Sequence, residues 1–409
     1  MRIAIVYPSL RAVGGAENVV IWLAESLVER GHYVSLFTWE FSEEVWGNMR
    51  ERPYNVCLLD FKKHRSTLRT NRDGGMALQR ALKLSLYEFD VINPHNYPAS
   101  LWVYYAKQQM KEFPRVLLYL HNLQPNFYEK ILSVHYRQLS GLRNMWNRYR
   151  PKKIFRSLRQ SLFGYRRLDK AAIASCDSVL ANSTYTACMA KKIYGIGVQS
   201  CPLGIPLERF KSYIEEASRF AAVNEQRSSL VTVARVEIQK NIDTILKAVK
   251  ILKERNSLPE GFHYKIAGGG PHLAYFKRKC HSMGLSDSVR FIGAVPHKDV
   301  WRLYAESDIL IHVPLDEPFG LVPVEAALLK KPSIVSNHGG PSEIVVDGVT
   351  GLHADALNPS DIAEKIAELA GHPEIAKKMG EAAYARTLRE MLWEEFVKKF
   401  ELALKCMRS

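Results

Sequence analysis

The sequence lacks the features that would place it among membrane-spanning or disulfide-stabilised proteins. It has no run of about eighteen apolar residues, the length that a membrane-spanning helix requires. Its 6 cysteines are scattered without a C-x-x-C pair, so neither a zinc site nor a disulfide framework is predicted. No tandem repeat or low-complexity segment interrupts the 409 residues. Residues 1–8 form a short apolar run that ends in proline, which indicates a buried strand rather than a signal peptide, so we expect a cytoplasmic protein.

Apolar runs alternate with amphipathic stretches along the chain, and this alternation predicts two α/β domains. In the first half, a helix is expected at 16–30, ended by Gly31, and buried parallel strands are expected at 3–7, 34–38, 91–93, 116–120 and 179–181. The second half predicts strands at 230–234, 264–267, 289–292, 309–312 and 333–336. Two prolines and a glycine interrupt the pattern at 202–206, which indicates a domain boundary. The predicted fold is therefore α/β, with two Rossmann-like domains facing across a cleft.

Two carboxylates eight residues apart, Glu317 and Glu325, flank a turn that opens a helix. Pro323 is placed as a first helical residue would be, so we expect the helix to start near Leu321 and to carry Glu325 in its first turn. On one continuous helix the two acids would lie about 12 Å apart, a poor arrangement for the paired carboxylates of a glycosidase. Between them, the backbone N–H groups of residues 319–322 suit a phosphate or diphosphate. The pattern predicts a charged, hydroxyl-rich ligand such as a nucleotide.

The segment E-P-F-G-L-V-P-V-E at 317–325 resembles the E-x7-E signature of the group 1, glycogen-synthase-like family of retaining nucleotide-sugar glycosyltransferases. Further segments resemble other blocks of this family in the family's order, and they are G-G-A-E at 14–17, V-A-R-V-E-I-Q-K-N at 233–241, I-A-G-G-G-P at 266–271, V-R-F-I-G at 289–293, G-G-P-S-E-I-V at 339–345 and D-G-V-T-G at 347–351. The stretch L-G-I-P-L-E-R-F at 203–210 is similar to the linker between the family's two domains. Together these blocks cover nearly the whole chain.

The resemblance implies the two-domain GT-B fold. Residues 1–201 would form a Rossmann-like domain that binds the acceptor, residues 202–385 a second one that binds the nucleotide sugar, and residues 386–409 a helix that packs back on the N-terminal domain. It also implies a retaining hexosyltransferase, with a nucleotide-diphospho-sugar of the GDP-mannose or UDP-glucose type as donor and a lipid-linked or membrane-proximal glycan as acceptor. The alternatives are a nucleotide-sugar epimerase or an inverting transferase on the related fold, or a non-catalytic nucleotide-sugar-binding protein.

Breaking the bond between a sugar and a nucleotide leaves extra negative charge on the departing diphosphate, which the enzyme must neutralise. Metal-dependent transferases hold a divalent ion with a D-x-D motif, and this sequence contains no D-x-D. We therefore expect no metal and no cofactor, and cations supplied by side chains. Arg235 and Lys240, which follow a predicted strand, resemble the diphosphate clamp of the family. Two ordinary surface cations would be the plain alternative.

The resemblance assigns hydrogen-bonding roles to both glutamates and to one histidine. Glu325 would accept hydrogen bonds from the nucleotide ribose and Glu317 from a hydroxyl of the donor sugar, with the leaving phosphate taking the proton of the acceptor. A carboxylate nucleophile remains the alternative, with Glu317 as the nearest candidate. His121 lies at the carboxyl end of a predicted strand and resembles the N-domain histidine that approaches the sugar, although it could be a structural cap. His95 holds the same position after its own strand and is a weaker candidate on the acceptor side.

Glycines and the start of the helix complete the expected donor site. The Gly14-Gly15 loop would let the backbone approach the donor phosphate at the start of a helix at Ala16, although two glycines often mark only a turn. The turn at 268–270 would border the base or serve as a tight exit from a strand. The donor-binding residues expected around the helix start are Phe319, Gly320, Leu321 and Val322.

The excess positive charge lies in the N-terminal half. Residues 137–170 contain eleven Lys or Arg and one acid, Asp169, among several aromatic side chains, and a second basic segment spans 62–72. This mixture favours an anionic membrane surface, although a solvated basic helix would look the same. No nucleic-acid recognition module is visible, so we expect no nucleic acid as partner. The residues expected on the acceptor or membrane side are Lys62, Lys63, Arg65, Arg148, Arg150, Lys152 and Lys153.

Overall fold

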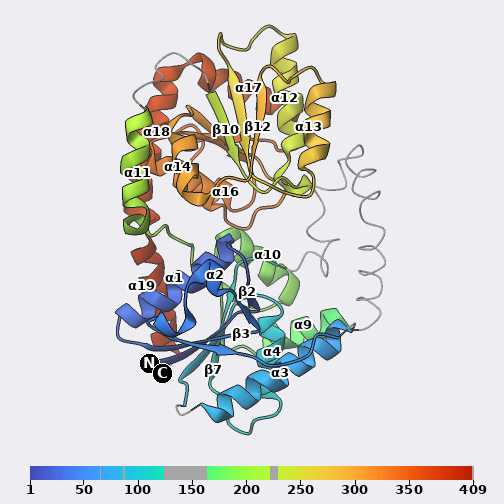
Figure 1. Cartoon of the computed structure of the whole chain (residues 1–409), viewed down its shortest axis with the longest axis vertical. Coiled ribbons are helices and arrows are strands. Elements are labelled where there is room, and N and C mark those ends of the chain that lie inside the picture. The colour runs from blue at the N-terminus through green and yellow to red at the C-terminus, as the bar shows by residue number, and fades with distance from the viewer. Residues whose placement is uncertain (65, 86–87, 124–163, 222–228, 408–409) are drawn as a thin grey trace. The chain divides into compact units, whose positions relative to one another are not determined.

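The computed structural model describes residues 1–64, 66–85, 88–123, 164–221 and 229–407, which divide into two compact units. The N-terminal unit takes the described residues up to Pro202 together with those from Phe396 onward, and the C-terminal unit takes Leu203–Glu395. Each unit contains a parallel sheet accompanied by helices (Figure 1). The predicted α/β class with two Rossmann-like domains is confirmed.

The N-terminal unit is built on a seven-stranded sheet with the order β5-β3-β1-β6-β7-β8-β9. The strands of the unit are β1 (Arg2–Val6), β2 (Ser9–Leu10), β3 (Tyr33–Thr38), β4 (Glu40–Phe41), β5 (Asn55–Leu58), β6 (Val91–Pro94), β7 (Arg115–Leu120), β8 (Ser178–Ala181) and β9 (Gln199–Ser200). The helices are α1 (Gly15–Glu29), α2 (Glu43–Trp46), the 3-10 turn η1 (Met49–Glu51), α3 (Thr67–Leu84), α4 (Ala99–Lys107), α9 (Tyr165–Ala174) and α10 (Thr184–Tyr194). The strand order reverses between β1 and β6, and open α/β sheets bind ligands at the carboxyl ends of strands at such a reversal.

The C-terminal unit is built on a six-stranded sheet with the order β12-β11-β10-β13-β14-β15. Its strands are β10 (Ser229–Val233), β11 (His263–Ala267), β12 (Val289–Gly293), β13 (Ile309–His312), β14 (Ser333–Ser336) and β15 (Gly351–Ala354). Its helices are α11 (Leu207–Ala221), the 3-10 turn η2 (Ile238–Lys240), α12 (Ile242–Glu254), α13 (Leu273–Ser282), α14 (His297–Ala305), α15 (Leu321–Leu328), α16 (Pro341–Ile344), α17 (Pro359–Gly371) and α18 (Pro373–Glu390). Here the order reverses between β10 and β13.

The predicted strands form where short apolar runs allow burial on both faces. All four residues of β13 and of β14 are buried, so the apolar residues of these strands are adjacent in the sequence and do not alternate with exposed polar ones. The sequence did not predict β5, whose residues are exposed or half-buried, nor the two-residue strands. It also missed β15, which begins with a glycine.

Helix α15 begins at Leu321 as predicted, but its first turn differs from the expectation. Pro323 is its third residue rather than its first, and Glu325 is its fifth, so that no acid lies in the first turn. Gly320 precedes the helix with φ 96°. A Cβ atom at this position would be strained, because L side chains rarely adopt this φ. Likewise, α1 begins at Gly15, one residue before the predicted start.

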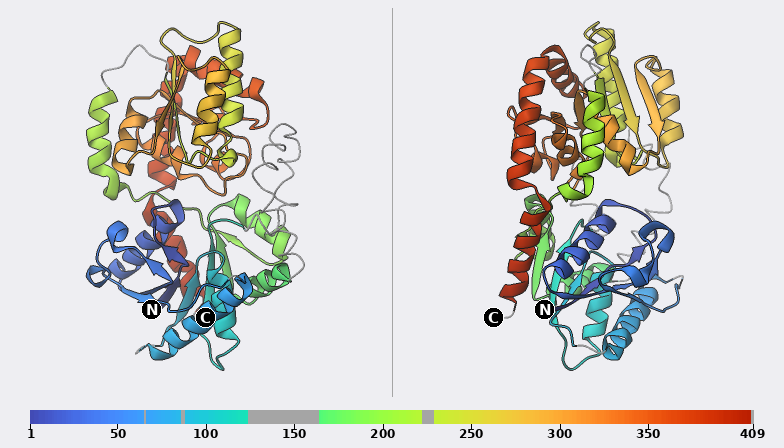
Figure 2. Two further views of the ribbon diagram at one scale, coloured as in Figure 1. Left: turned by 45° about the vertical axis from the view of Figure 1, so that its right-hand side comes forward. Right: turned by 60° about the vertical axis from the view of Figure 1, so that its left-hand side comes forward.

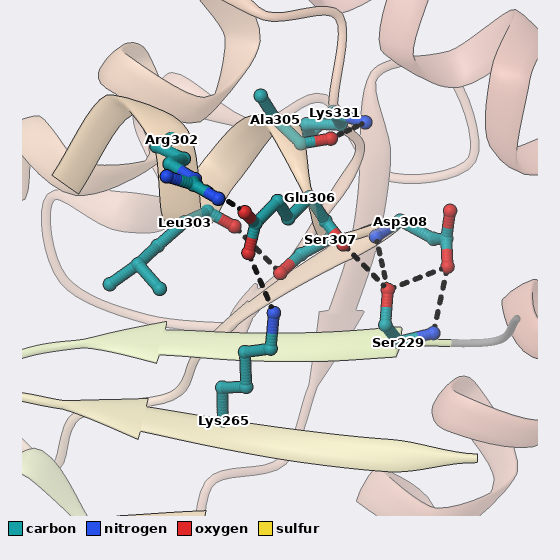
Figure 3. A network of polar contacts seen from close by, with 9 residues as sticks. All are labelled: Ser229, Lys265, Arg302, Leu303, Ala305, Glu306, Ser307, Asp308 and Lys331. Atoms are coloured by element: carbon teal, nitrogen blue, oxygen red, sulfur yellow. Dashed lines mark hydrogen bonds and ion pairs between the residues drawn. The ribbon is translucent and has the colours of Figure 1, made fainter. Parts of the chain in front are cut away.

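The amino ends of the central strands of the C-terminal unit are held by a polar network (Figure 3). Asp308 precedes β13, and its Oδ2 accepts hydrogen bonds of 2.7 Å from both the backbone N–H and the hydroxyl of Ser229 in β10. Glu306 accepts from Lys265 of β11 at 3.0 Å and from Arg302 of α14 at 2.6 Å. These contacts stabilise the edge opposite the strand ends that carry Lys240 and Glu317.

The last helix, α19 (Trp393–Cys406), packs with most of its length against the N-terminal unit. Phe396 and Phe400 lie 5.7 and 6.2 Å from the ring of Tyr119 in β7, measured between ring centroids. Glu401 pairs with Arg30 at 2.8 Å at the end of α1. Figure 2 shows the helix, in red, running beside the strands of this unit. None of the helices in the described part of the chain combines the length and apolar character needed to cross a bilayer.

Candidate functional site

The candidate site of the C-terminal unit lies where its strand order reverses. The segment after β10 carries Arg235 and Lys240, and the segment after β13 carries Glu317. Because β10 and β13 are parallel neighbours, both segments leave the sheet at the same edge. Residues that are 77 positions apart in the sequence are thereby brought together.

Lys240 and Glu317 form an ion pair at this edge, with the Lys240 ammonium donating a hydrogen bond to Glu317 Oε2. The side chains are 25% and 19% exposed. Burial on its own would raise the pKa of Glu317, but the charge of Lys240, the nearby His312 and the hydrogen bond from Lys240 outweigh it and lower that pKa. Glu317 is therefore a carboxylate at neutral pH.

His312 is a site residue that the sequence analysis missed. It is the last residue of β13, its side chain is 4% exposed, and its Nε2 lies 3.9 Å from Glu317 Oε2. This nitrogen is buried and has no hydrogen-bond partner among the described residues. Burial lowers the pKa of His312 to about 4, an effect that Glu317 opposes and Lys240 reinforces. A neutral ring with an unused polar atom thus faces the ion pair.

Arg235 is not part of this cluster. Its side chain is 72% exposed, and its Nε lies 3.0 Å from Oε1 of Glu237. The structure thus gives the two predicted clamp residues different partners, Glu237 for Arg235 and Glu317 for Lys240.

Glu325 also has partners of its own. The buried hydroxyl of Tyr304 donates a 2.7 Å hydrogen bond to Glu325 Oε2, and His297 Nε2 lies 3.6 Å from Oε1. Burial raises the pKa of Tyr304 far above its usual value, and the negative charge of the neighbouring Glu325 raises it further. The phenol therefore keeps its proton and remains a hydrogen-bond donor. The two glutamates are held by separate groups, one on each side of the turn at residues 318–320.

Glycines let the backbone segments of the site pack against one another. A Cβ atom on Gly340 would lie 2.3 Å from Phe319 Cα, and the Gly340 N–H donates to Glu317 O at 2.8 Å. A Cβ on Gly268, which has φ 141°, would lie 1.9 Å from the carbonyl oxygen of Ala234. Close backbone packing therefore accounts for the glycines at both positions, and in the second case it supports the structural use considered for the turn at 268–270.

In the N-terminal unit, Gly14 precedes α1 without a side-chain cap, as a site for a ligand phosphate would require. The carboxylate of Glu17 lies at this helix start, because a Cβ on Gly14 would come within 2.3 Å of Glu17 Oε2. The Tyr7 hydroxyl donates to the other oxygen of Glu17 at 2.8 Å. A phosphate at this position would therefore meet a carboxylate as well as the helix N-terminus.

His121 follows β7 and has partners through both its main chain and its ring. Its N–H donates to Asn96 Oδ1 and its carbonyl accepts from Asn182 Nδ2, each at 2.7 Å. The ring Nε2 lies 2.8 Å from Nδ1 of His95, which follows β6. Burial lowers the pKa of His121 to about 3 and that of His95 well below its usual value. The ring of His121 is therefore in hydrogen-bond contact with a second histidine.

Two protein-family models match successive parts of the chain. The model of the family "Glycosyltransferase Family 4" matches residues 13–209, and the model of "Glycosyl transferases group 1" matches residues 214–386. The chain belongs to the group 1 glycosyltransferases. As in its family, this glycosyltransferase takes its sugar from a nucleotide sugar.

Individual relatives share the whole architecture or a large part of it. The glycosyltransferase is 25% identical to the human alpha-1,3/1,6-mannosyltransferase ALG2 over 96% of this chain and 93% of the human protein. It is 27% identical to a GDP-mannose-dependent alpha-(1-6)-phosphatidylinositol monomannoside mannosyltransferase of Mycobacterium tuberculosis, over 54% of this chain and 60% of that protein. The fold matches sucrose-phosphate synthase from Thermosynechococcus elongatus with a TM-score of 0.78 at 17% identity, over 99% and 98% of the two chains. These similarities establish the two-domain GT-B fold.

The residues predicted for the acceptor or membrane side are described only in part. Lys62 and Lys63 are exposed, and the Lys63 ammonium lies 5.6 Å from the ring centroid of Trp39. The other predicted residues of this side, Arg65, Arg148, Arg150, Lys152 and Lys153, lie outside the described residues. Among the described residues, no group of three or more His, Cys, Asp or Glu side chains is arranged to hold a metal ion.

Two of the residues that the sequence analysis missed, His312 and Asn93, share one signal. Asn93 lies in β6, with its Oδ1 2.7 Å from Nε2 of His95, and His312 ends β13, so both are polar residues near the carboxyl ends of buried strands. A buried polar side chain at this edge of a parallel sheet is a candidate ligand contact, and this criterion would have identified both. Tyr304, by contrast, lies on α14, and only the packing of α14 against α15 reveals its contact with Glu325.

We expect the free energy of unfolding to fall as the pH is lowered from about 7.5 to about 5.5. His95, His121 and His312 are buried with lowered pKa values, whereas in the unfolded chain each histidine takes up a proton near pH 6.5. The unfolded state binds more protons below this pH. The contribution of the three neutral histidines to the free energy of unfolding is therefore fully present above pH 6.5 and is lost as the pH falls towards their pKa values in the folded state. Urea unfolding at several pH values measures the slope of the free energy of unfolding against pH.

His312→Leu should make this slope smaller, because it removes one of the three buried histidines. His372→Gln, at an exposed position at the end of α17, is the control and should leave the slope as it is. A stability that stays constant or rises on acidification to pH 5.5 would contradict the burial of these three rings in neutral form.

Proposed function

We propose that this glycosyltransferase moves a mannosyl residue from GDP-mannose to a lipid-linked or membrane-proximal glycan, with retention of the anomeric configuration and without a metal ion. The observation that carries the proposal is the Lys240–Glu317 ion pair beside the unpartnered nitrogen of His312, at the reversal point of the sheet. A cation, a carboxylate and an unused buried donor or acceptor suit a diphosphate joined to a sugar.

Lys240 is the cation that meets the diphosphate in this proposal. In the free protein its ammonium pairs with the carboxylate of Glu317, and a bound diphosphate would compete with that carboxylate for the N–H groups of Lys240. As the bond to the anomeric carbon breaks, negative charge grows on the diphosphate and its attraction to Lys240 increases. Arg235 is exposed, and it could leave its partner Glu237 to bind a second phosphate.

Glu317 serves best as a hydrogen-bond acceptor for the donor sugar. Its lowered pKa keeps it ionised, but its direct pairing with Lys240 weakens it as a nucleophile. The acceptor hydroxyl then attacks on the face that the diphosphate leaves. Its oxygen bonds to the anomeric carbon, the bond from that carbon to the diphosphate oxygen breaks, and the departing phosphate takes the hydroxyl proton. His312 offers its free nitrogen to the same ligand, and Glu325, oriented by Tyr304, accepts from the ribose.

Two relatives support GDP-mannose as donor and a lipid as acceptor. ALG2 is a mannosyltransferase, and the mycobacterial enzyme is GDP-mannose-dependent and acts on a phosphatidylinositol monomannoside. A lipid acceptor fits the concentration of positive charge in residues 62–72 and 137–170, since anionic headgroups attract Lys and Arg.

Thermal unfolding in the presence of nucleotide sugars tests the donor. GDP-mannose and GDP should raise the melting temperature, because a ligand that binds only the folded state stabilises it by about 2.7 kcal/mol at a hundred times its dissociation constant. UDP-glucose and UDP at equal concentration are the comparison, and Glu325→Ala is the variant expected to reduce the shift. A shift with uridine nucleotides alone would refute GDP-mannose as donor, and no shift with any nucleotide would refute the donor site.

Replacement of Lys240 tests the role of the cation. Lys240→Ala should lower kcat by about a hundredfold or more while weakening donor binding by less than about tenfold, since the interaction strengthens as the diphosphate leaves. Lys250→Ala, on the exposed face of α12, is the matched control and should change neither constant. Excess EDTA should leave wild-type activity intact. A requirement for a divalent metal, or equal losses in binding and turnover, would contradict the clamp.

Vesicle flotation tests the membrane surface. The protein should float with vesicles that contain anionic lipids and not with neutral ones, and Lys62→Glu with Lys63→Glu should weaken this binding by at least roughly fivefold per lysine, since each surface lysine contributes about 1 kcal/mol. Lys377→Glu with Lys378→Glu, an exposed pair on α18, is the control. Equal binding to neutral and anionic vesicles, or none to either, would sink this part of the proposal.

A further inference from the structure

Three buried polar side chains form a continuous chain at the carboxyl ends of β6 and β7. Asn93 lies in β6 and is completely buried, His95 follows β6 and is completely buried, and His121 follows β7 and is 6% exposed. Nε2 of His95 lies 2.7 Å from Asn93 Oδ1, and Nδ1 of His95 lies 2.8 Å from His121 Nε2. The two imidazole rings are stacked, with centroids 5.1 Å apart. Nothing in the proposed chemistry so far uses Asn93 or His95.

The contact between Asn93 and Leu117 determines the direction of each hydrogen bond in this series of side chains. Asn93 Nδ2 lies 2.5 Å from the carbonyl oxygen of Leu117, and a carbonyl can only accept, so the amide N–H must face Leu117. The amide oxygen therefore faces His95 and accepts from an N–H on its Nε2. A neutral imidazole carries one N–H, so Nδ1 of His95 is an acceptor, and the bond to His121 requires the N–H to be on His121 Nε2.

Neutrality of both rings is supported by their surroundings. Burial lowers the pKa of both histidines, and the neighbouring His121 lowers that of His95 further. The phenol of Tyr119, whose ring centroid is 4.9 Å from that of His121, is itself buried and donates a hydrogen bond to the carbonyl oxygen of Cys201. Its pKa is raised well above the usual value by burial, so it stays uncharged.

We propose that Asn93 and His95 are positioning residues that hold His121 as the Nε2–H tautomer, so that Nδ1 of His121 presents a lone pair to a sugar hydroxyl. The hydroxyl belongs to the transferred hexose or to the glycan acceptor, and in both cases it donates to His121. This inference rests on the proposed function for the nature of the ligand, whereas the tautomer itself does not depend on it. His121 thereby selects ligands with a hydroxyl at that position and disfavours those that present only an acceptor.

The tautomer can be measured on the unmodified protein. In the full-length chain labelled with 15N-histidine, the two ring nitrogens give different shifts and couplings when protonated and when not. His121 and His95 should both show a protonated Nε2 and a bare Nδ1, unchanged between about pH 6 and 8. His121→Gln assigns the signals. A protonated Nδ1 on His121, or a doubly protonated ring at neutral pH, would overturn the proposal whether or not the donor and acceptor are correctly identified.

Two replacements of His95 separate positioning from simple packing. His95→Asn places an amide oxygen near the position of Nδ1 and can still accept from His121, whereas His95→Leu cannot. We expect kcat to fall by about tenfold or more in His95→Leu, by analogy with the loss caused when the partner that orients a metal-bound histidine is removed, and by clearly less in His95→Asn. His32→Leu replaces another largely buried histidine of the same unit, outside the site, and should leave kcat unchanged.

The Michaelis constants distinguish the two sources of the hydroxyl. A rise confined to the donor KM in His121→Phe assigns the hydroxyl to the transferred sugar, and a rise confined to the acceptor KM assigns it to the glycan. Equal kcat losses in both His95 variants, with the tautomer of His121 unchanged, would reduce His95 to a packing residue. If the wild-type protein has the expected tautomer but transfers no sugar, the proposed function fails and the tautomer assignment stands.

Discussion

The parallel pairing of β10 with β13 is the constraint on which the C-terminal site depends. Leu230 pairs with Ile309 and Val231 with Leu310, so both strands point the same way and end at the same edge. From β10 the chain continues to the neighbouring β11 and from β13 to β14, in opposite directions along the sheet, which is the arrangement at which open α/β sheets bind ligands. Lys240, Glu317 and His312 meet at this edge, while the network of Asp308 and Glu306 stabilises the opposite end of the same strands.

Glycine allows the backbone segments of this site to pack closely against one another. Gly268 allows the turn after β11 to press on the segment that carries Arg235, and Gly340 allows the turn before α16 to press on the segment that carries Glu317. In both places a Cβ atom would overlap backbone atoms, which cannot move aside as the end of a side chain can. The main chain that carries Arg235 and Glu317 is therefore closely packed, and in the case of Glu317 the pairing with Lys240 also holds the charged group, as preorganised electrostatic stabilisation requires.

Both units place buried histidines at strand ends, and in both the ring is neutral. In the C-terminal unit, His312 has an unused nitrogen beside an ion pair, and in the N-terminal unit His121 has its ring fixed through His95 and Asn93. Leaving a buried polar atom without a partner costs about 1–3 kcal/mol, which a protein tolerates where a ligand supplies the missing hydrogen bond. A neutral imidazole can recognise hydroxyl groups by direction without introducing a charge near the diphosphate.

The sequence by itself determined the fold class, the strands that are buried on both faces, the start of α15 and the family, because all of these depend on local runs of residue type and on motifs of contiguous residues. Only the tertiary structure decided the partners. It joined Lys240 to Glu317, assigned Arg235 to Glu237, and placed His312 against Glu317 and His95 against His121. Glu325 lies outside the first turn of α15, because it is the fifth residue of a helix that begins at Leu321. Contacts between segments far apart in the sequence follow from strand order and backbone packing, and no local pattern encodes either one.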